Sequence, residues 1–337
     1  MVERLSLPGF VNTHSHTFQR ALRGSAEGDD FWAWREAMLA LAERQTPELV
    51  RERYLETYRE MLAAGYTAVG EFHYLGLAEA RAALVAGAEA GISIVLLLAA
   101  YARGGLARFR ARSVGEYLRG LEELRDEGFR VGLAPHSVRA CPREWLEELG
   151  RYAEREQLVL HVHADEQPRE IEECLREYGV RPVELLAETG CLGPRTTVVH
   201  ATNADDRELE LIAEAGARVC VCPTTEANLG DGFAPAAALR ERGIGICVGS
   251  DSNVRIDPLE ELRELEGIAR RGGRRRNVFP VGTLLCFGAD EGAAALGLEE
   301  WPETHIDLDH PSLRGVDGAD ALGALVFGCG ADVVARG

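Results

Sequence analysis

The chain has 337 residues, 46% hydrophobic and 27% charged, which is enough to bury a large core in one α/β barrel with an appendage or in two domains. Its 55 acidic residues against 37 basic ones give a net charge of -18, which argues against nucleic acid or an anionic membrane as the main partner. All 37 basic residues are arginine, so a lysine Schiff base, a P-loop lysine and a lysine carbamate bridging two metals are excluded.

The first stretch, Met1–Phe10, lacks the basic and then apolar layout of a signal peptide. The eight cysteines form no C-x-x-C pair and stand in apolar stretches, which favours reduced, buried thiols. The longest apolar run, Ile92–Ala100, is too short to cross a bilayer and is typical of a buried strand. We therefore expect a cytoplasmic protein.

Short apolar runs rich in strand-forming residues alternate with helical patterns up to Asp251. The predicted strands are Phe10–His14, Ala68–Phe72, Ile92–Ala99, Val131–Pro135, Leu158–His163, Thr197–His200, Arg218–Cys222 and Gly245–Asp251. Helix starts are indicated at Thr46-Pro47-Glu48, at Cys141–Glu144 and at Ala204–Glu208. Glycines typical of helix ends precede strands at Gly65, Gly91, Gly128, Gly216 and Gly243. Eight strands with helices between them predict a closed (β/α)₈ barrel, and no G-x-G-x-x-G supports the doubly wound alternative.

The residues after Asp251 predict three further helices, at Pro258–Arg270, Val281–Phe287 and Glu291–Leu296. The arginine-rich run from Arg270 to Arg276 is broken by glycines, and we interpret it as a solvated loop in preference to a polyanion site.

Histidines gather at the carboxyl ends of the predicted strands. Seven of the nine lie there, and Asp251 ends the eighth strand: His14, His16, His73, His136, His161, His163 and His200. A single histidine at a strand end is usually structural, but in a barrel this end is where active sites are built. Three imidazoles and a carboxylate suit Zn²⁺ and leave a position for an activated water. Metal-dependent hydrolysis is therefore the function that the residues favour.

Several motifs occur in a fixed order between Pro8 and Arg270. They are Asn12–Gly24 (NTHSHTFQRALRG), Phe31–Arg35 (FWAWR), Glu71–Tyr74 (EFHY), Ala134–Ala140 (APHSVRA), His161–Gln167 (HVHADEQ), Val199–Thr202 (VHAT), Thr225–Gly232 (TEANLGDG) and Ser250-Asp251-Ser252. Together they resemble the amidohydrolase superfamily, in its mononuclear deaminase branch. The resemblance is closest to members that hydrolyse the formimino group of N-formimino-L-glutamate in histidine degradation.

The resemblance implies one Zn²⁺, with Fe²⁺ and Mn²⁺ left open, held by His14, His16, His163 and Asp251. It implies that His200 and Asp251 deprotonate the attacking water and that Glu166 carries protons to the leaving nitrogen. Hydroxide would attack the formimino carbon, ammonia would leave, and N-formyl-L-glutamate would form. The resembling proteins bind the metal with the second histidine of the HVH motif, so His161 is expected to pack in the core or to support the metal ligands.

The substrate of such an enzyme is a dicarboxylate. A chain of charge -18 repels it, so local arginines are needed, and their forks bind carboxylates in pairs of hydrogen bonds. The resemblance assigns substrate contacts to Gln19, Arg35, Tyr74, His136 and Arg139. It also implies that Glu226, Asn228 and Asp231, expected in a loop after the seventh strand, shape the pocket wall.

Two other classes of function stay open. One is another hydrolase on this scaffold, either a deaminase of a purine-like ring or a ring-opening enzyme like imidazolonepropionase. A ring substrate would require aromatic stacking and amide hydrogen bonds in place of Arg35 and Arg139. The other is a non-catalytic barrel, against which the complete set of metal-site residues argues.

The resembling proteins carry a small β-sandwich made from both ends of the chain, and both ends are short here. We expect residues 8–300 to form the metal-dependent barrel with its C-terminal helices, and 301–337 with 1–7 to be a remnant of the small β domain. Its strands are predicted at Ile306–Asp309, Ala324–Phe327 and Asp332–Val334. Exposed apolar surface needs cover, so a homodimer is expected, with no nucleic-acid or membrane partner.

Overall fold

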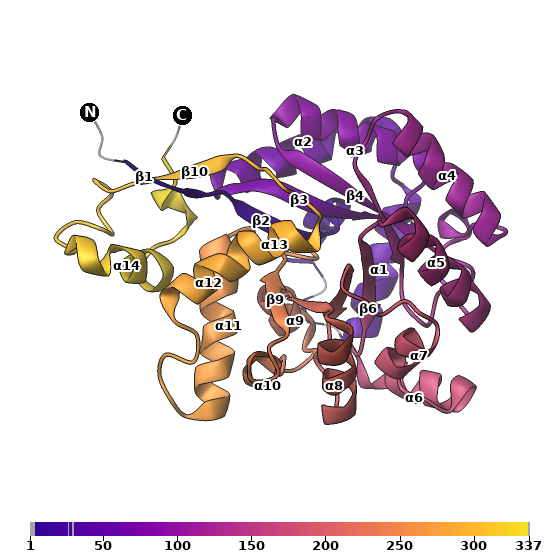
Figure 1. Cartoon of the computed structure of the whole chain (residues 1–337). Helices are drawn as coiled ribbons and strands as arrows, with labels where there is room; N and C mark the ends of the chain where they lie inside the picture. Colours follow the sequence, from indigo (N-terminus) through magenta and orange to yellow (C-terminus); the bar gives the residue numbers. More distant parts are fainter. Residues whose placement is uncertain (1–3, 26, 29, 336–337) are drawn as a thin grey trace.

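The computed structural model of the chain describes residues 4–25, 27–28 and 30–335. Eight parallel strands lie side by side in chain order (Figure 1). They are β2 (Phe10–Ser15), β3 (Tyr66–His73), β4 (Ser93–Ala100), β5 (Val131–Pro135), β6 (Leu160–Ala164), β7 (Thr196–His200), β8 (Arg218–Val221) and β9 (Gly245–Val248). Each coincides with a predicted strand, and the predicted (β/α)₈ barrel is confirmed.

The first and last strands meet at their carboxyl ends, where the barrel closes. The amide of Asp251 donates to the carbonyl of His14 at 2.9 Å, and the amide of His16 donates to the carbonyl of Asp251 at 2.8 Å. Gly249 makes this approach possible, because a Cβ at that position would lie 2.7 Å from the carbonyl oxygen of His14. The barrel thus closes through backbone hydrogen bonds between His14, His16 and Asp251, three of the residues expected to bind the metal.

Helices cover the outside of the barrel (Figure 1). The helices between β2 and β9 in the chain are α1 (Phe31–Glu43), α2 (Pro47–Ala63), α3 (Leu77–Ala90), α4 (Val114–Asp126), α5 (Arg143–Glu156), α6 (Pro168–Tyr178), α7 (Pro182–Glu188), α8 (Asp206–Ala215), α9 (Pro223–Leu229) and α10 (Ala236–Glu241). After the last strand come α11 (Pro258–Gly273), α12 (Val281–Gly288), α13 (Asp290–Ala295) and α14 (Ala321–Gly328). Short 3₁₀ turns occupy Thr17–Leu22, Ala107–Phe109, Gly318–Asp320 and Ala331–Val333.

The predicted helix signals act as expected. The hydroxyl of Thr46 accepts from the amide of Leu49 at the start of α2, and Asp205 caps α8 by accepting from the amide of Glu208. Gly91 and Gly216 end α3 and α8 in the left-handed conformation that glycine adopts without strain.

The two ends of the chain form a small antiparallel sheet beside the barrel. β1 (Arg4–Pro8) pairs with β10 (Glu303–Asp307), and Val334 bridges to Ile306. The predicted strand at Ala324–Phe327 is wrong, because these residues lie in α14. Four apolar residues alone do not distinguish a strand from a buried helix, and α14 packs against α11. The domain limits expected at 1–7 and 301–337 include residues 1–3 and 336–337, which lie outside the described residues.

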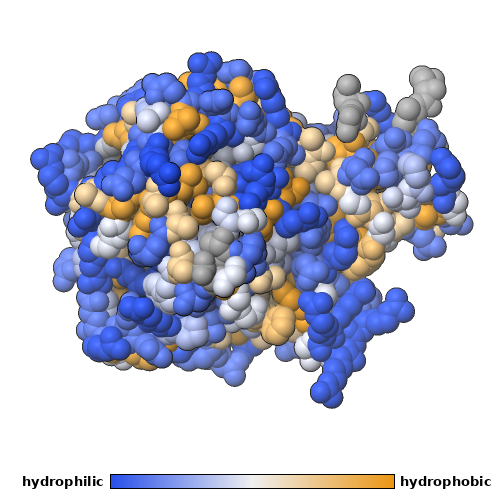
Figure 2. Space-filling view, turned by 180° about the vertical axis from the view of Figure 1, so that it is seen from behind, coloured by the Kyte–Doolittle hydropathy of each residue, from blue (hydrophilic) through white to orange (hydrophobic). Residues whose placement is uncertain are grey.

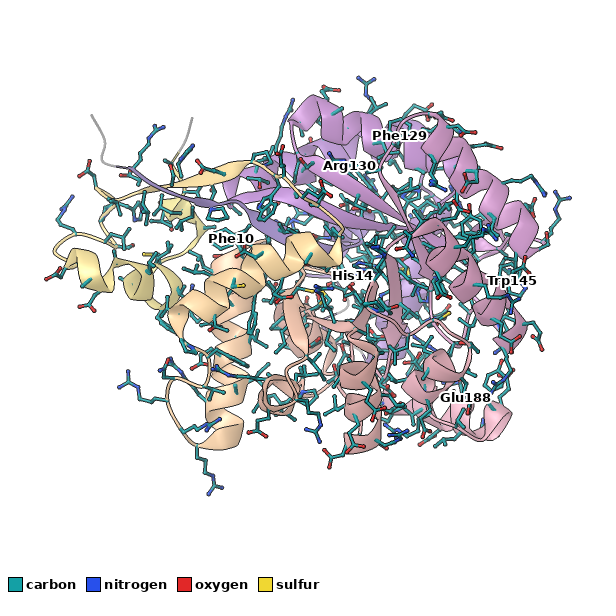
Figure 3. The ribbon with its side chains drawn as sticks, viewed as in Figure 1. Phe10, His14, Phe129, Arg130, Trp145 and Glu188 are labelled. Atoms are coloured by element: carbon teal, nitrogen blue, oxygen red, sulfur yellow. The ribbon has the colours of Figure 1, made fainter. Side chains whose placement is uncertain are left out.

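The side chains in the barrel interior differ from those on the outer surface. In Figure 3, His14 lies near the centre of the barrel, whereas the exposed Glu188 lies at the periphery of the molecule. The face seen in Figure 2 is hydrophilic over most of its area, with apolar side chains between the hydrophilic ones.

All eight cysteines are unpaired, and seven of them are buried. Among the described residues, no helix combines the length and the apolar character needed to cross a membrane.

Candidate metal centre and its pocket

Four side chains converge at the carboxyl end of the barrel. His14 is in β2, His16 follows it, His163 is in β6, and Asp251 follows β9. The Nε2 atom of His14 lies 3.2 Å from that of His16 and 3.0 Å from that of His163. Oδ1 of Asp251 lies 3.5 Å from Nε2 of His14 and 3.4 Å from Nε2 of His16. All four residues are buried, and the four ligand atoms lie within 4.8 Å of one another.

The other ring nitrogens explain this orientation. Nδ1 of His16 donates to the carbonyl of Phe72 at 3.0 Å, and Nδ1 of His163 donates to the carbonyl of His136 at 2.9 Å. A histidine that donates one ring N–H to a carbonyl presents the other nitrogen to a metal as a lone pair. Burial lowers the pKa of His14 to about 3 and also lowers that of His16. Both rings are therefore in the neutral form that binds metals.

The spacing of the four atoms fits a divalent cation. A tetrahedral site with ligands at about 2.0–2.1 Å has edges of about 3.3–3.4 Å between ligand atoms. The distances between ligand atoms around His14 and His16, from 3.0 to 3.5 Å, bracket that value. The Nε2 lone pairs of His16 and His163 lie 3.4 Å apart and beside the Asp251 carboxylate, a group of acceptors that a cation satisfies. The donor set, three imidazoles and one carboxylate, suits Zn²⁺ and neighbouring transition metals.

His200 lies beside this cluster and points at Asp251. Its Nδ1 is 3.2 Å from Oε1 of Glu226, and its Nε2 is 3.8 Å from Oδ2 of Asp251. Burial lowers the pKa of His200, but the carboxylates of Glu166 and Glu226 outweigh burial and hold that pKa well above its usual value. His200 and Asp251 both have positive φ, 76° and 42°, a strained conformation that is found most often where a side chain must be aimed.

Glu166 stands on the opposite side of His200 from Glu226. Its Oε1 lies 3.7 Å from Nε2 of His200, and its Oε2 lies 3.5 Å from Nη2 of Arg139. Glu170 supports both partners, since it accepts from the amide of Glu166 at 3.3 Å and lies 3.3 Å from Nε of Arg139. This arrangement joins a potential proton carrier to a potential carboxylate-binding group.

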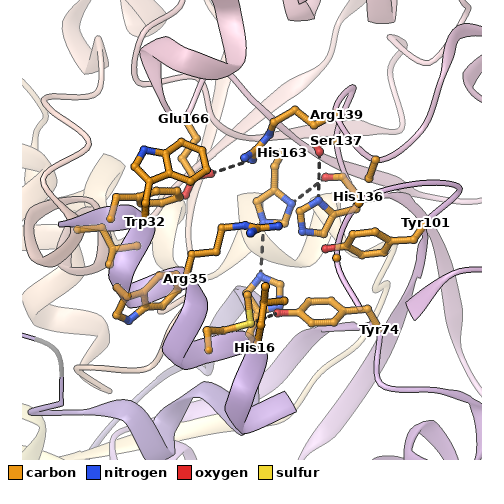
Figure 4. A pocket seen from close by; sticks show the side chains of 18 of the residues that line it. His16, Trp32, Arg35, Tyr74, Tyr101, His136, Ser137, Arg139, His163 and Glu166 are labelled. Carbon is orange, nitrogen blue, oxygen red and sulfur yellow. Dashed lines mark hydrogen bonds and ion pairs between the residues drawn. The ribbon is translucent and has the colours of Figure 1, made fainter. Parts of the chain in front are cut away.

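A cavity of about 340 Å³ opens over the cluster (Figure 4). All five residues predicted to contact substrate line it: Gln19, Arg35, Tyr74, His136 and Arg139. The amide of Gln19 donates to the hydroxyl of Tyr74 at 2.9 Å, which fixes both side chains. Glu166, His200 and Asp251 line the same cavity. The structure therefore brings the proposed catalytic residues and the proposed substrate contacts to one site.

Arg35 enters this cavity from α1. Among the described residues it forms an ion pair with Glu36 alone, at 3.4 Å, and 74% of that partner's side chain is exposed. In Figure 4 its guanidinium points into the cavity that the imidazoles of His16 and His163 also face. Arg35 is thus a cation with a weak partner inside a cavity, which is what an incoming carboxylate needs.

Other lining residues could not be assigned from the sequence. Trp32 belongs to the FWAWR motif, which drew attention only to Arg35. The guanidinium carbon of Arg169 lies 4.4 Å from the ring centre of Trp32, and this pair spans α1 and α6 at the rim. Tyr101, beyond β4, contacts His136 with ring centres 4.5 Å apart. No sequence pattern marks Arg169 or Tyr101, since only the fold brings them here.

Two rim histidines stand apart from the cluster. Nε2 of His73 bonds to the carbonyl of Gly76 at 3.1 Å, and Nε2 of His161 bonds to the carbonyl of Ala295 at 2.9 Å. His161 therefore supports packing against α13, as expected.

The loop predicted after the seventh strand is in part a helix. Glu226 and Asn228 lie in α9, which begins at Pro223 and ends before Gly230, while Asp231 follows it. Proline at the first turn and glycine after the last are helix signals that the turn-like composition concealed. Of these three residues, Glu226 bonds to His200 and Asp231 bonds to Gln167. None of the three lines the cavity over the metal-ligand cluster.

Comparisons with known proteins agree with this geometry. A family model described as the amidohydrolase family matches residues 5–300. The chain is 39% identical, over 80% of its length, to a formimidoylglutamate deiminase from Pseudomonas aeruginosa, of which the match covers 66%. It is 29% identical, over 88% of its length, to a 5'-deoxyadenosine deaminase from Methanothermobacter thermautotrophicus, of which 70% is covered.

A crystal structure of an amidohydrolase from Brucella melitensis has the same fold, with a TM-score of 0.85 and 32% identity. The match covers 98% of this chain and 84% of that one. The chain spans about two thirds of the length of the Pseudomonas relative.

Proposed function

Because the chain belongs to the amidohydrolase family, we propose that it catalyses the zinc-dependent hydrolytic deimination of N-formimino-L-glutamate to N-formyl-L-glutamate and ammonia. The observation that carries the proposal is a single cavity in which the metal-ligand cluster stands beside Arg35 and Arg139. Similarity to the Pseudomonas formimidoylglutamate deiminase supports the choice of substrate.

The charges of the cavity match a dicarboxylate. Arg35 has only a weak, exposed partner, and Arg139 has its two carboxylate partners at 3.3 and 3.5 Å, longer than a strong ion-paired hydrogen bond. Each guanidinium can therefore exchange its present contacts for a substrate carboxylate. Tyr74 and Gln19, bonded to each other, line the cavity close to the metal ligands, where the formimino end of the substrate would lie.

His14, His16, His163 and Asp251 would hold one zinc ion. Zinc, when bound, supplies a Lewis acid that lowers the pKa of a water to about 7, so that hydroxide is available at neutral pH. The backbone carbonyls of Phe72 and His136 keep two of these imidazoles oriented toward it.

The proton transfers follow from the distances around His200. A cation held by the cluster would lower the pKa of the adjacent His200. Neutral Nε2 of His200, beside Oδ2 of Asp251, would then accept one proton of the attacking water as the water oxygen bonds to the formimino carbon. Glu166, 3.7 Å from the same nitrogen, would pass the proton held by His200 to the terminal nitrogen of the tetrahedral intermediate. As the C–N bond breaks, the second proton of the water would pass from the hydroxyl of the intermediate through Glu166 to the same nitrogen. Ammonia thus leaves with both protons, and the carbon retains the water oxygen as the formyl carbonyl.

A ring deaminase is the second candidate. Aromatic residues line the cavity, among them Trp32, Trp34, Tyr74 and Tyr101, and they could stack on a purine. The match to a 5'-deoxyadenosine deaminase points the same way. The two guanidinium groups favour the dicarboxylate.

The test is ammonia release by the zinc-loaded protein from N-formimino-L-glutamate, N-formimino-L-aspartate, guanine and 5'-deoxyadenosine. We expect the first to be turned over fastest, and Glu166→Gln to lower kcat by about 10²–10⁴-fold, the usual contribution of a general acid or base. Glu173→Gln, a change at the rim of the same cavity, is the matched control and should leave kcat unchanged. Turnover of only the purine substrates would replace the proposal with the second candidate.

A further inference from the structure

Cys222 is a buried thiol that the proposed reaction does not use. It follows β8 directly, and its amide donates to Oε1 of Glu226 at 2.9 Å. Its Sγ, a ring nitrogen of His200 and a carboxylate oxygen of Asp251 all lie within 4.8 Å of one another, and all three residues are buried. These are three different metal-binding donors at one point, beside the cluster already described.

Nε2 of His200 is the ring nitrogen that faces Asp251, at 3.8 Å from Oδ2. Its Nδ1 is occupied by Glu226 at 3.2 Å, while its Nε2 has no hydrogen-bond partner among the described residues although only 1% of the side chain is exposed. A buried ring nitrogen without a partner costs free energy unless something binds it. A carboxylate that holds the far nitrogen of an imidazole is the usual support of a metal-binding histidine.

The two oxygens of Asp251 divide between the two places. Oδ1 faces His14 and His16, at 3.5 and 3.4 Å, whereas Oδ2 faces His200 at 3.8 Å. One carboxylate can therefore bridge two cations, with one oxygen on each.

We propose that His200, Cys222 and Asp251 form a second metal site, which takes Zn²⁺ or a comparably soft divalent cation and which inhibits the enzyme when filled. Imidazole, thiolate and carboxylate together select Zn²⁺ or Co²⁺ over Mg²⁺ and Ca²⁺. The inhibition, unlike the binding, rests on the proposed function, because the second cation occupies Nε2 of His200, which accepts the proton of the attacking water, and Oδ2 of Asp251 beside it.

The second site binds more weakly than the first. The distance of 3.8 Å between Nε2 of His200 and Oδ2 of Asp251 must contract by about 0.5 Å to reach the edge of a tetrahedral zinc site. Cys222 and His200 must also each release a proton to solvent when the metal binds, and both side chains are buried. The site should therefore fill only after the His14 cluster is occupied.

Cobalt(II) alone is a suitable probe, because thiolate ligation to Co²⁺ produces a strong near-ultraviolet charge-transfer band that imidazole and carboxylate ligation do not. The metal-free chain is titrated with Co²⁺ while absorbance and bound metal are measured. We expect no thiolate band during the first equivalent and its growth during the second. In Cys222→Ser the band and the second equivalent should be lost while the first equivalent is retained.

Cys220→Ser is the matched control, because Cys220 is a buried thiol two residues earlier on β8 that does not belong to the three-donor group. It should keep both equivalents and the band. With zinc, the concentration that halves activity should rise at least about tenfold in Cys222→Ser, since even changes to groups that only orient a ligand cost about 10–100-fold in affinity.

A wild-type chain that binds one equivalent and shows no thiolate band would overturn the second site, whether or not any variant folds. A band that persists in Cys222→Ser would also overturn it. Failure of the proposed function appears separately, as absence of deiminase activity at one equivalent of metal, and leaves the spectroscopic result intact.

Discussion

The metal-ligand cluster and the arginine-bearing wall of the same cavity are built in opposite ways. The cluster residues come from strand ends, and two of its imidazoles are held by backbone carbonyls at 2.9–3.0 Å. The arginines Arg35 and Arg139 come from a helix and from the segment after β5, with side chains 29% and 21% exposed and partners at 3.3–3.5 Å. The groups proposed for chemistry are fixed before substrate arrives, whereas the groups proposed for recognition keep contacts that substrate can replace.

This contrast implies that changes to the cluster affect metal content and kcat, and that changes to the wall affect mainly KM. Rigid polar groups act on the transition state without rearrangement, while loosely paired cations contribute binding energy. Four changes to the chain test this division.

The largest effect is expected for His163→Ala. It removes one of four ligands, so bound metal should fall toward zero and activity by more than about 10⁴-fold, because without the metal the pKa of water returns from about 7 toward 15.7. His161→Ala is the matched control, since His161 lies two residues earlier on β6 and bonds to the carbonyl of Ala295. Bound metal and ammonia release are measured for both variants. Loss of metal in the His161 variant alone would contradict the assignment.

Glu71 belongs to a buried hydrogen-bond network next to the metal-ligand cluster. It accepts from the amide of Thr17 at 3.2 Å and lies 3.4 Å from the hydroxyl of Tyr58, yet burial raises its pKa from 4.5 to about 8. Between these values the folded chain keeps a proton that the unfolded chain releases. This group therefore lowers stability by about 1.4 kcal/mol per pH unit as pH rises through that window, and adds nothing further above it.

The variant Glu71→Gln stays neutral, so its free energy of unfolding should rise relative to wild type between pH 5 and pH 8. Denaturant unfolding at three pH values in that interval measures the difference. Glu43→Gln, at an exposed position, should show no such trend. A constant difference between Glu71→Gln and wild type would mean that Glu71 is ionised throughout.

Arg35→Met tests the wall. Loss of a charge-assisted hydrogen bond of about 1.5–3 kcal/mol should raise KM for N-formimino-L-glutamate by about 10–100-fold, with a smaller change in kcat and no loss of bound metal. Stability should change little, because Glu36, the ion-pair partner of Arg35 in the described part of the chain, is exposed. Steady-state kinetics with the monocarboxylate N-formimino-glycine as a second substrate checks the reason: the variant should lose less on the substrate with one carboxylate. A fall in kcat alone would place Arg35 with the chemistry.

Arg169→Ala should have the smallest effect. Its side chain is 58% exposed, and its contact with Trp32 is an exposed cation–π interaction of about 0.5–1 kcal/mol. A rise in KM of about two- to fivefold is expected from the same assay. A larger rise would mean that the rim, as well as Arg35, binds a substrate carboxylate.

The barrel was predictable from sequence because buried parallel strands are nearly continuous apolar runs between helix signals, and all eight stand out in this way. The metal-ligand cluster was reachable because histidines at strand ends meet at one edge of a barrel. His73 and His161 show the limit: strand-end position alone does not say whether a ring faces the cavity or a carbonyl. The predicted homodimer and domain limits stay predictions.

The failures have physical causes. The sequence predicts a strand at Ala324–Phe327 because four consecutive apolar residues fit a buried strand as well as a buried helix, and only packing against α11 selects the helix. Arg169 and Tyr101 join the pocket through contacts between distant segments, which no local pattern encodes.

The seam at which Asp251 bonds to the backbone of His14 and His16 also bears on how the chain is made. These partners come from the first and last strands of the barrel, so a ribosome releases one long before the other. A nascent chain holds His14 and His16 first and gains His163 with β6, but Asp251 follows β9 and emerges only when the whole barrel has been made. Contacts so distant in sequence form late. Metal capture should therefore coincide with completion of the barrel, which would make bound metal a reporter of the finished fold instead of its nucleus.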